Sequence, residues 1–304
     1  MEPQPLVSIV TPCLNASRFI QTTIDSVLGQ DYPNLEYLVM DGGSTDGTIE
    51  ILQRYGDRLQ YFSAPDQGAA DAINRGFGRS KGSIVAWINA DDEYLPGAIS
   101  TAVRQFNEHP ETDVVYGEAI WTDENGCEIR RYPTESPYRP GMFAEECGIC
   151  QPAVFMRRKA LAAAGFLNIR RKNGFDYDLW VRLARQHRFQ AVSEVLATSR
   201  MHPANLTLAN RRLGYLENMN VLREGYGYVP VNWIYGYLSF LRDGRDQFFE
   251  PLRHSPAVYL AALPVGSLYN YKHLWRYWRE WGSRLRMENL VRVWKEESCR
   301  KEGR

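Results

Sequence analysis

The chain has 304 residues, a formal net charge of zero and 44% hydrophobic residues. This length fits one large domain or a domain with an appendage, and the balanced charge excludes a general nucleic-acid binder. The five cysteines are an odd number, which favours a reducing compartment over a disulfide framework. Because the first residues lead directly into a strand and no apolar run reaches the ~18 residues of a membrane-spanning helix, we expect a cytoplasmic protein.

The N-terminal third alternates between short apolar runs and amphipathic stretches. It predicts strands at 6–10, 35–40, 59–62 and 83–88, and helices at 15–30, at 48–55 and after 66–68. Strands that alternate with helices imply a parallel sheet with right-handed crossovers. Thr11-Pro12 is expected to stop the first strand.

Polar side chains follow each of these strands at the point where it ends. They are Thr11, Asp41, Asp66 and Asp91. In an open parallel sheet these ends share one edge, where ligands bind. Asp41 and Asp91 can accept hydrogen bonds from a nucleotide base or from ribose hydroxyls. Neither a GxGxxG fingerprint after the first strand nor a P-loop motif occurs, so the usual dinucleotide and P-loop classes are excluded.

Asp91 and Asp92 stand side by side at the exit of a buried strand. Two carboxylates are costly there unless a cation or ligand hydroxyls satisfy them. Oxygen ligands of this kind suit Mg²⁺ or Mn²⁺. The alternative is a helix cap, since Asp before the stretch 93–98 is a good N-terminal signal. On this pair alone the two interpretations have equal weight.

Four ordered blocks of the sequence form a longer pattern. They are 8–12 with Asn15, 41–48, 65–76 and 89–92. In this order they resemble the family-two inverting glycosyltransferases of GT-A fold, over residues 5 to 207. The resemblance implies an α/β fold, Rossmann-like with a mostly parallel central sheet. It also implies a catalytic domain at 1–209, with a nucleotide-sugar half at about 1–95 and an acceptor half at about 96–209.

The resemblance further implies roles for individual residues. The residues that would bind the nucleotide-sugar are Thr11, Pro12, Asn15, Asp41, Asp66, Gly68 and Asp91. Asp92 would ligate Mg²⁺ or Mn²⁺ as the last residue of a DxD-type motif. His202 would reach back to the metal or the diphosphate, with a structural histidine as the equal alternative. Asp176 matches the general base, although Phe175 stands where the family usually has Glu.

The acceptor half gives weaker signals. Gln151 lies in a stretch that resembles the acceptor-side strand of the family, where it could touch sugar hydroxyls or serve a structural role. Cys147 and Cys150 form a CxxC pair, which is a poor zinc signal without a second pair.

Residues 210–304 differ in character, because Trp and Tyr recur there, and they predict a mainly helical extension. From Lys272 to Arg304 there are ten Lys or Arg against five Asp or Glu. Aromatic and basic residues together suit a membrane interface, which would place the enzyme at the inner face of the plasma membrane. The equal alternative is packing on the catalytic domain or on a second subunit, as in a homodimer.

Taken with these observations, the resemblance implies an inverting hexosyl- or N-acetylhexosaminyl-transferase. It would move a sugar from a nucleotide-sugar donor, UDP-linked, to a glycan or lipid-linked acceptor, with metal assistance, in polysaccharide or glycoconjugate biosynthesis. One alternative is a nucleotidyltransferase, which normally needs a Gly-rich basic loop where this chain has 12–18 with Arg18 as its only base. The other is an inactive nucleotide-sugar-binding module, against which the intact carboxylates argue.

Overall fold

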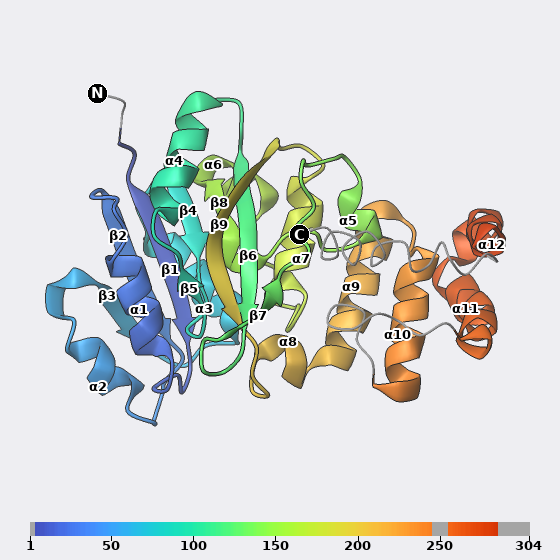
Figure 1. Cartoon of the computed structure of the whole chain (residues 1–304), viewed down its shortest axis with the longest axis horizontal. Helices are drawn as coiled ribbons and strands as arrows, with labels where there is room; N and C mark the ends of the chain where they lie inside the picture. The colour runs from blue at the N-terminus through green and yellow to red at the C-terminus, as the bar shows by residue number, and fades with distance from the viewer. Residues whose placement is uncertain (1–3, 245–254, 285–304) are drawn as a thin grey trace, which may run out of the picture. The chain divides into compact units, whose positions relative to one another are not determined.

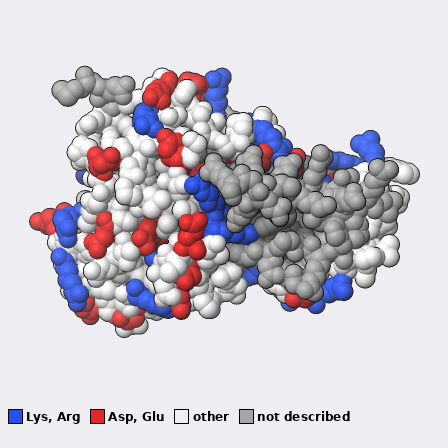
Figure 2. All heavy atoms as spheres, in the orientation of Figure 1, with Lys and Arg blue, Asp and Glu red and all other residues white. Residues whose placement is uncertain are grey.

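The computed structural model describes residues 4–244 and 255–284, and the chain separates into two compact units. The first extends to Ala209 and the second begins at Asn210. No helix in the two described stretches combines the length and the apolar character needed to cross a bilayer. On the face drawn in Figure 2, basic and acidic side chains are interspersed, in keeping with a net charge of zero.

The first unit is built on one mixed sheet (Figure 1). Its strands are β1 (Val7–Cys13), β2 (Leu35–Asp41), β3 (Gln60–Ser63), β4 (Ile84–Trp87), β5 (Glu93–Tyr94), β6 (Val114–Thr122), β7 (Glu128–Arg131), β8 (Val154–Arg157) and β9 (Phe189–Arg200). The spatial order is β3-β2-β1-β4-β8-β6-β9-β5, with β7 beside β6. Strands β1 to β4 pair in parallel and β6 is parallel to β9, whereas β8 is antiparallel to both its neighbours. The predicted parallel N-terminal sheet is confirmed, so the carboxyl ends of β1 to β4 share one edge.

Amphipathic helices cover this sheet. They are α1 (Ile20–Leu28), α2 (Thr48–Gln53), α3 (Ala69–Arg79), α4 (Ala98–Glu108), α5 (Met142–Glu145), α6 (Arg158–Ala164), α7 (Phe175–Leu183) and α8 (Leu206–Ala209). The helix α1 shows the pattern, because Ile20, Ile24 and Val27 recur at i, i+4 and i+7 and are all fully buried. This spacing places them on one stripe that faces the core.

A stacked pair of tryptophans joins the two halves of the first unit. Trp87 on β4 and Trp180 on α7 are fully buried, with ring centres 5.5 Å apart and planes inclined by 17°. Phe77 meets Trp87 edge to face. Because β4 leads to the carboxylate pair at 91–92 and α7 carries Asp176 in its first turn, this stack fixes one candidate group relative to the other.

The strand β1 extends further than expected. It continues through Thr11 and Pro12 to Cys13, so the prediction that Thr11-Pro12 ends the strand is wrong. Pairing with β4 stops at Val10, and only β2 accompanies the last three residues. The missing N–H of Pro12 is therefore tolerated, as at an edge strand.

The helix-cap interpretation of the carboxylate pair is also wrong. Glu93–Tyr94 forms the strand β5, which pairs with Thr198 and Ala197 of β9, and α4 begins only at Ala98. The local cap signal is overridden by pairing with a strand a hundred residues later in the chain. The carboxylates at 91–92 thus stand in a loop between two strands.

The second unit is helical, which confirms the predicted extension. Its helices are α9 (Arg211–Tyr226), α10 (Val231–Asp243), α11 (Pro256–Tyr269) and α12 (Leu274–Ser283). Asn270, fully buried, donates to the carbonyl of Val229 at 2.9 Å and accepts from its N–H at 2.8 Å. This paired contact fixes the turn before α10 against the end of α11.

The packing of α3 on the sheet provides a test of the fold. A methyl group on Gly76 would lie 2.5 Å from Cγ1 of Val10, so Gly76→Ala should destabilise the protein by roughly 1–3 kcal/mol through overpacking. Gly78, on the same helix, has open space around its Cα. Gly78→Ala should be neutral or stabilising by up to about 1 kcal/mol. Urea unfolding of both variants measures the difference, and equal stability of the two would contradict this packing.

Candidate functional site

The loop after β2 is shaped by the carboxylate of Asp41. Its Oδ2 accepts from the N–H groups of Gly43 and Ser44, at 2.9 and 3.0 Å, and from the Ser63 hydroxyl at 2.6 Å. The Ser44 hydroxyl donates to Oδ1. Burial by itself raises the pKa of Asp41, but these hydrogen bonds outweigh it and hold the pKa below its ordinary value. Asp41 is therefore an ionised group that organises the loop.

The loop after β1 is tied to the same segment through Asn15. Its N–H donates to the Ser44 hydroxyl at 2.7 Å, and its Oδ1 accepts from the N–H of Thr45 at 2.9 Å. Asn15 has a φ of 51°, a left-handed conformation that Asn adopts more readily than most residues. The apolar spacing predicted a helix that begins at Asn15, but α1 begins at Ile20. This anchoring of Asn15 explains the difference.

Thr11 and Pro12 lie in β1, ahead of this loop. Thr11 is fully buried, and its hydroxyl is 3.0 Å from the hydroxyl of Tyr37. Pro12 is buried opposite Met40 of β2. The Thr11 side chain thus braces β1 against β2, and its contact with a nucleotide stays a prediction.

Asp66 lies close to the β2 loop. A methyl group built on Gly42 would be 2.8 Å from Asp66 Oδ2. The other oxygen accepts from the N–H of Gly68 at 2.7 Å, and the Lys172 ammonium donates to the carbonyl of Gln67 at 2.7 Å. The loops after β1, β2 and β3 therefore meet at one edge, as the parallel order requires.

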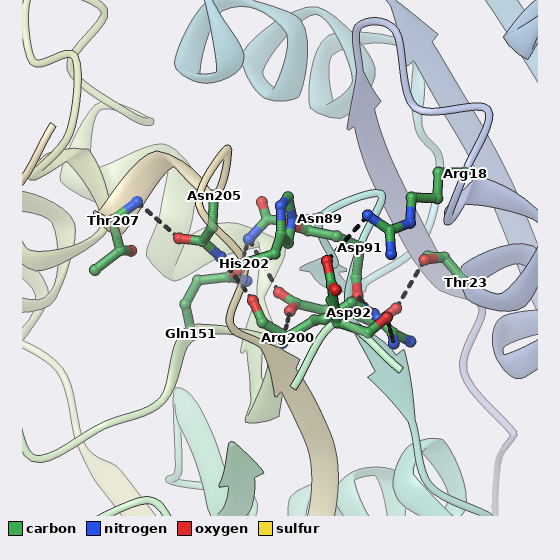
Figure 3. A network of polar contacts seen from close by, with 11 residues as sticks. Arg18, Thr23, Asn89, Asp91, Asp92, Gln151, Arg200, His202, Asn205 and Thr207 are labelled. Atoms are coloured by element: carbon green, nitrogen blue, oxygen red, sulfur yellow. Dashed lines mark hydrogen bonds and ion pairs between the residues drawn. The ribbon is translucent and has the colours of Figure 1, made fainter. Parts of the chain in front are cut away.

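Asp91 and Asp92 have opposite surroundings (Figure 3). Asp92 is only 2% exposed, and its oxygens accept from the N–H of Arg200 at 2.9 Å and from the amide of Asn89 at 3.1 Å. Burial, and then the charge of Asp91, raise the pKa of Asp92 well above its ordinary value. Asp91 instead directs Oδ2 to Nε2 of His202, at 3.0 Å. The structure thus pairs His202 with Asp91, and the metal-binding role of Asp92 and His202 stays a prediction.

Arg200 brings the end of β9 to this loop. Its Nε donates to the carbonyl of Asp91 at 2.9 Å and its Nη1 to the carbonyl of Glu124 at 3.2 Å. Nη2 pairs with the carboxylate of Glu93. The Arg200 side chain is only 6% exposed. Because His202 follows two residues later, these contacts determine where its imidazole lies.

The Gln151 side chain holds Asn89, the first residue of the block 89–92. Its Nε2 donates to the carbonyl of Trp87 at 2.8 Å, and its Oε1 accepts from the amide of Asn89 at 3.1 Å. The Asn89 amide also donates to Asp92. These contacts favour the structural role that the sequence left open beside acceptor binding.

Asp176 occupies the first turn of α7 and accepts from the N–H of Tyr177 at 2.7 Å. Burial, and then the charge of Asp176, raise the pKa of Cys147 to about 12. The pKa of Cys150 is raised by burial and by the charges of Asp92 and Asp176, among others. Cys150 therefore lies close enough to feel the charges of both Asp92 and Asp176. These carboxylates come from the nucleotide half and the acceptor half, so the two halves meet near Cys150. Thiols with raised pKa values are poor nucleophiles and poor metal ligands.

Glu146 is a titratable residue near the site that the sequence analysis did not single out. Burial, and then the charges of Glu135 and Glu145, raise its pKa to about 7, while Arg139 opposes the shift. A carboxyl with such a pKa is a candidate for acid–base chemistry. Glu146 also acts on the pKa of Cys147, more weakly than Asp176 does. No local motif marks Glu146, since its pKa depends on how its neighbours are folded around it.

The Asp91–His202 pair offers a carboxylate oxygen and an imidazole nitrogen, which are ligand types that a divalent cation takes. In this structure the two atoms are 3.0 Å apart, in hydrogen-bonding contact with each other. In residues 4–244 and 255–284 no group of three or more His, Cys, Asp or Glu side chains is placed to hold a metal. A cation here would therefore need oxygens from substrate or water to complete its shell.

Comparison with known proteins finds a matching family and similar relatives. Residues 8–165 match the family model of glycosyl transferase family 2. An uncharacterized glycosyltransferase of Rickettsia typhi is 31% identical over 235 residues, which cover 73% of this chain and 71% of the relative.

Two solved structures share the fold. One is Staphylococcus aureus TarS 1–349 in complex with UDP-GlcNAc, with a TM-score of 0.62 and 16% identity, covering 87% of this chain and 81% of that one. The other is the mannosyltransferase PcManGT from Pyrobaculum calidifontis in complex with GDP-Man and Mn²⁺, with a TM-score of 0.58 and 20% identity over 88% and 74%. The chain therefore belongs to glycosyl transferase family 2 and is a glycosyltransferase of GT-A fold.

Proposed function

We propose that this enzyme transfers a sugar from a UDP-linked donor to a hydroxyl of a glycan or lipid-linked acceptor, with inversion at the anomeric carbon and metal assistance. The observation that supports this most is the Asp91–His202 pair, which stands beside the converging loops after β1, β2 and β3. Loops at this edge of a parallel sheet can bind a nucleotide. Its diphosphate would then lie at the exit of β4.

The loops after β1, β2 and β3 would bind the nucleotide. Asn15, Asp41, Asp66 and Gly68 would hold the base and ribose, with Asp41 fixing the backbone of its loop. The UDP-GlcNAc bound to TarS supports a UDP-linked donor. The GDP-Man bound to PcManGT indicates that the same fold also accepts another base, so the base depends on side chains within these loops.

Asp91 and His202 are the residues that would hold the cation, and the Mn²⁺ in the PcManGT complex supports Mn²⁺ or Mg²⁺. A bound cation would offset the charge that develops on the leaving diphosphate. Asp92 has a different part in this scheme. Its two oxygens hold Arg200 and Asn89, so it supports the loop that presents Asp91.

Asp176 would act as the general base. It would take the proton of the acceptor hydroxyl while the hydroxyl oxygen forms a bond to the anomeric carbon. The bond from that carbon to the diphosphate oxygen breaks on the opposite side, which inverts the configuration. The position of Asp176 in the first turn of α7, with Trp180 of the same helix stacked on Trp87, gives it a fixed orientation.

Two other classes of protein can be distinguished from this one. A nucleotidyltransferase would need a basic Gly-rich loop after β1, where this chain uses Asn15 to anchor Ser44 and Thr45. An inactive binding module would hold a nucleotide-sugar without turnover. Release of UDP from a panel of UDP-sugars, dependent on an added acceptor, is expected only of the glycosyltransferase.

The first test concerns the base. Asp176→Asn should lower the transfer rate by roughly 10²–10⁴-fold, because general base catalysis contributes about that much. Binding of UDP, measured as a shift of the melting temperature, should be unchanged. Glu146→Gln is the matched comparison and should retain most activity. A large loss in Glu146→Gln together with an active Asp176→Asn would move the base to Glu146.

The second test separates the two adjacent carboxylates. Asp91→Asn should weaken Mn²⁺ binding in the presence of UDP, measured from the free Mn²⁺ signal in electron paramagnetic resonance, because an amide is a poorer ligand for a hard cation. Asp92→Asn should mainly lower the free energy of unfolding, by about 1–3 kcal/mol, because it weakens a buried contact. EDTA should abolish turnover of the wild type. If Asp92→Asn loses Mn²⁺ at unchanged stability, Asp92 is the ligand.

The third test concerns Arg200. Arg200→Lys keeps the positive charge but cannot reach Asp91, Glu93 and Glu124 together, so it should lower the free energy of unfolding by roughly 1–3 kcal/mol and weaken Mn²⁺ binding. Arg104→Lys is the control, since the Arg104–Glu194 pair is exposed and should change stability by less than about 0.5 kcal/mol. Wild-type Mn²⁺ affinity in Arg200→Lys would exclude a positioning role.

A further inference from the structure

The second unit presents large apolar side chains to solvent around the start of α12. Leu268 is 78% exposed, Tyr271 64%, Trp275 82% and Trp278 43%. These four residues, from the end of α11 to the middle of α12, are called the aromatic face below. Single exposed apolar residues are ordinary, but a group that includes two tryptophans indicates an interaction surface.

The inward side of α12 is already complete without these residues. Tyr277 is fully buried and donates to the carbonyl of Ala262 at 2.7 Å. Trp281 stacks on Tyr259, with ring centres 4.7 Å apart, and its indole donates to the Tyr259 carbonyl at 2.9 Å. The helix thus packs on α11 mainly through this side, while most of the Trp275 side chain is exposed and Trp278 contacts α11 through a hydrogen bond to Ser267.

The two tryptophans of the aromatic face are in contact. The rings of Trp275 and Trp278 meet edge to face, with centres 5.5 Å apart. The indole N–H of Trp278 donates to the hydroxyl of Ser267 at 2.9 Å, next to Leu268 in the chain. In Figure 1, α11 and α12 accordingly lie side by side.

The charge next to the aromatic face is positive. Lys272 and Arg279 are exposed, and the Lys272 ammonium lies 5.7 Å from the centre of the Tyr271 ring. The acidic residue of α12 is Glu280, whose carboxylate accepts from the hydroxyl of Tyr228 and from the N–H of Val231 at 3.1 Å. Its charge is directed into the second unit and does not neutralise the two exposed cations.

We propose that the aromatic face, with Lys272 and Arg279, docks α12 onto the surface of an anionic lipid bilayer. Indole and phenol rings favour the headgroup region, where their apolar rings and polar groups are both accommodated. Each Lys or Arg near an anionic surface adds roughly 1 kcal/mol of attraction. The contact lies on the membrane and needs no spanning helix.

A second copy of the chain fits this face less well. A twofold contact sets the same patch against itself, so the cations of one copy would be brought close to those of the other at an apolar contact. Like charges brought together in this way oppose association, whereas anionic headgroups complement them. The sequence left a membrane contact over 272–304 and packing on the protein as equal alternatives. Residues 285–304 lie outside the described part, and the proposal rests on 268–279.

The test uses the full chain without sugar donor, so it is independent of the proposed glycosyl transfer. Cosedimentation with vesicles of phosphatidylcholine and phosphatidylglycerol at low salt should recover the wild type. Trp275→Ala combined with Trp278→Ala should lower the bound fraction at least tenfold, with unchanged circular dichroism. Leu241→Ala, at an exposed apolar residue on α10, is the control and should bind as the wild type does.

Two further measurements separate the source of the attraction. Lys272→Gln combined with Arg279→Gln should weaken binding to anionic vesicles, and 1 M salt should do the same, because the screening length falls to about 3 Å. Asp176→Asn should bind vesicles as the wild type does, whatever its activity. Failure of the wild type to bind anionic vesicles overturns the proposal. So does equal binding by the double tryptophan variant, or a concentration-dependent dimer that this variant alone loses.

Discussion

The buried carboxylate of Asp92 is the constraint on which the candidate site depends. A carboxylate removed from water is stable only when its oxygens are bonded, and here the partners are the N–H of Arg200 and the amide of Asn89. These bonds join the exit of β4 to the end of β9. The Thr23 hydroxyl donates to the carbonyl of Asp92 at 2.8 Å and adds α1 to the same junction. Three distant segments therefore meet at one residue, Asp92.

This junction places the groups that face the reaction. With Asp92 turned into the protein, Asp91 is left to meet His202. The ring of Phe19, the residue before α1, supports the arrangement, since it lies 4.8 Å from the His202 ring and 5.1 Å from the Arg200 guanidinium. The pKa values of Asp41 and Asp92 are shifted in opposite directions. Hydrogen bonds lower the pKa of Asp41, whereas burial raises the pKa of Asp92. One carboxylate shapes a loop as an anion, and the other strengthens a junction between strands.

The sequence could predict the parallel strands and the edge where their polar ends meet, because apolar runs and turn residues report local structure directly. It could not predict which of Asp91 and Asp92 turns inward. That choice depends on Arg200, a residue 108 positions away. The same limit applies to β5, whose pairing with β9 overrides a good cap signal, and to Gln151, whose amide is engaged by Trp87 and Asn89. Contacts between distant segments produce no periodic pattern of apolar residues from which they could be predicted.

The helix α12 shows the same limit in the second unit. Its tryptophans and tyrosine are dense enough to mark the segment, but density does not say which of them pack inward. Tyr277 and Trp281 are four residues apart and share the side that packs on α11. Trp275 and Trp278 are three apart and share another side, which remains exposed. The pair Tyr277 and Trp281 completes the packing of α12 inside its own unit. The exposed surface of Trp275 and Trp278 is available to a partner outside that unit, although the Trp278 indole N–H donates to Ser267.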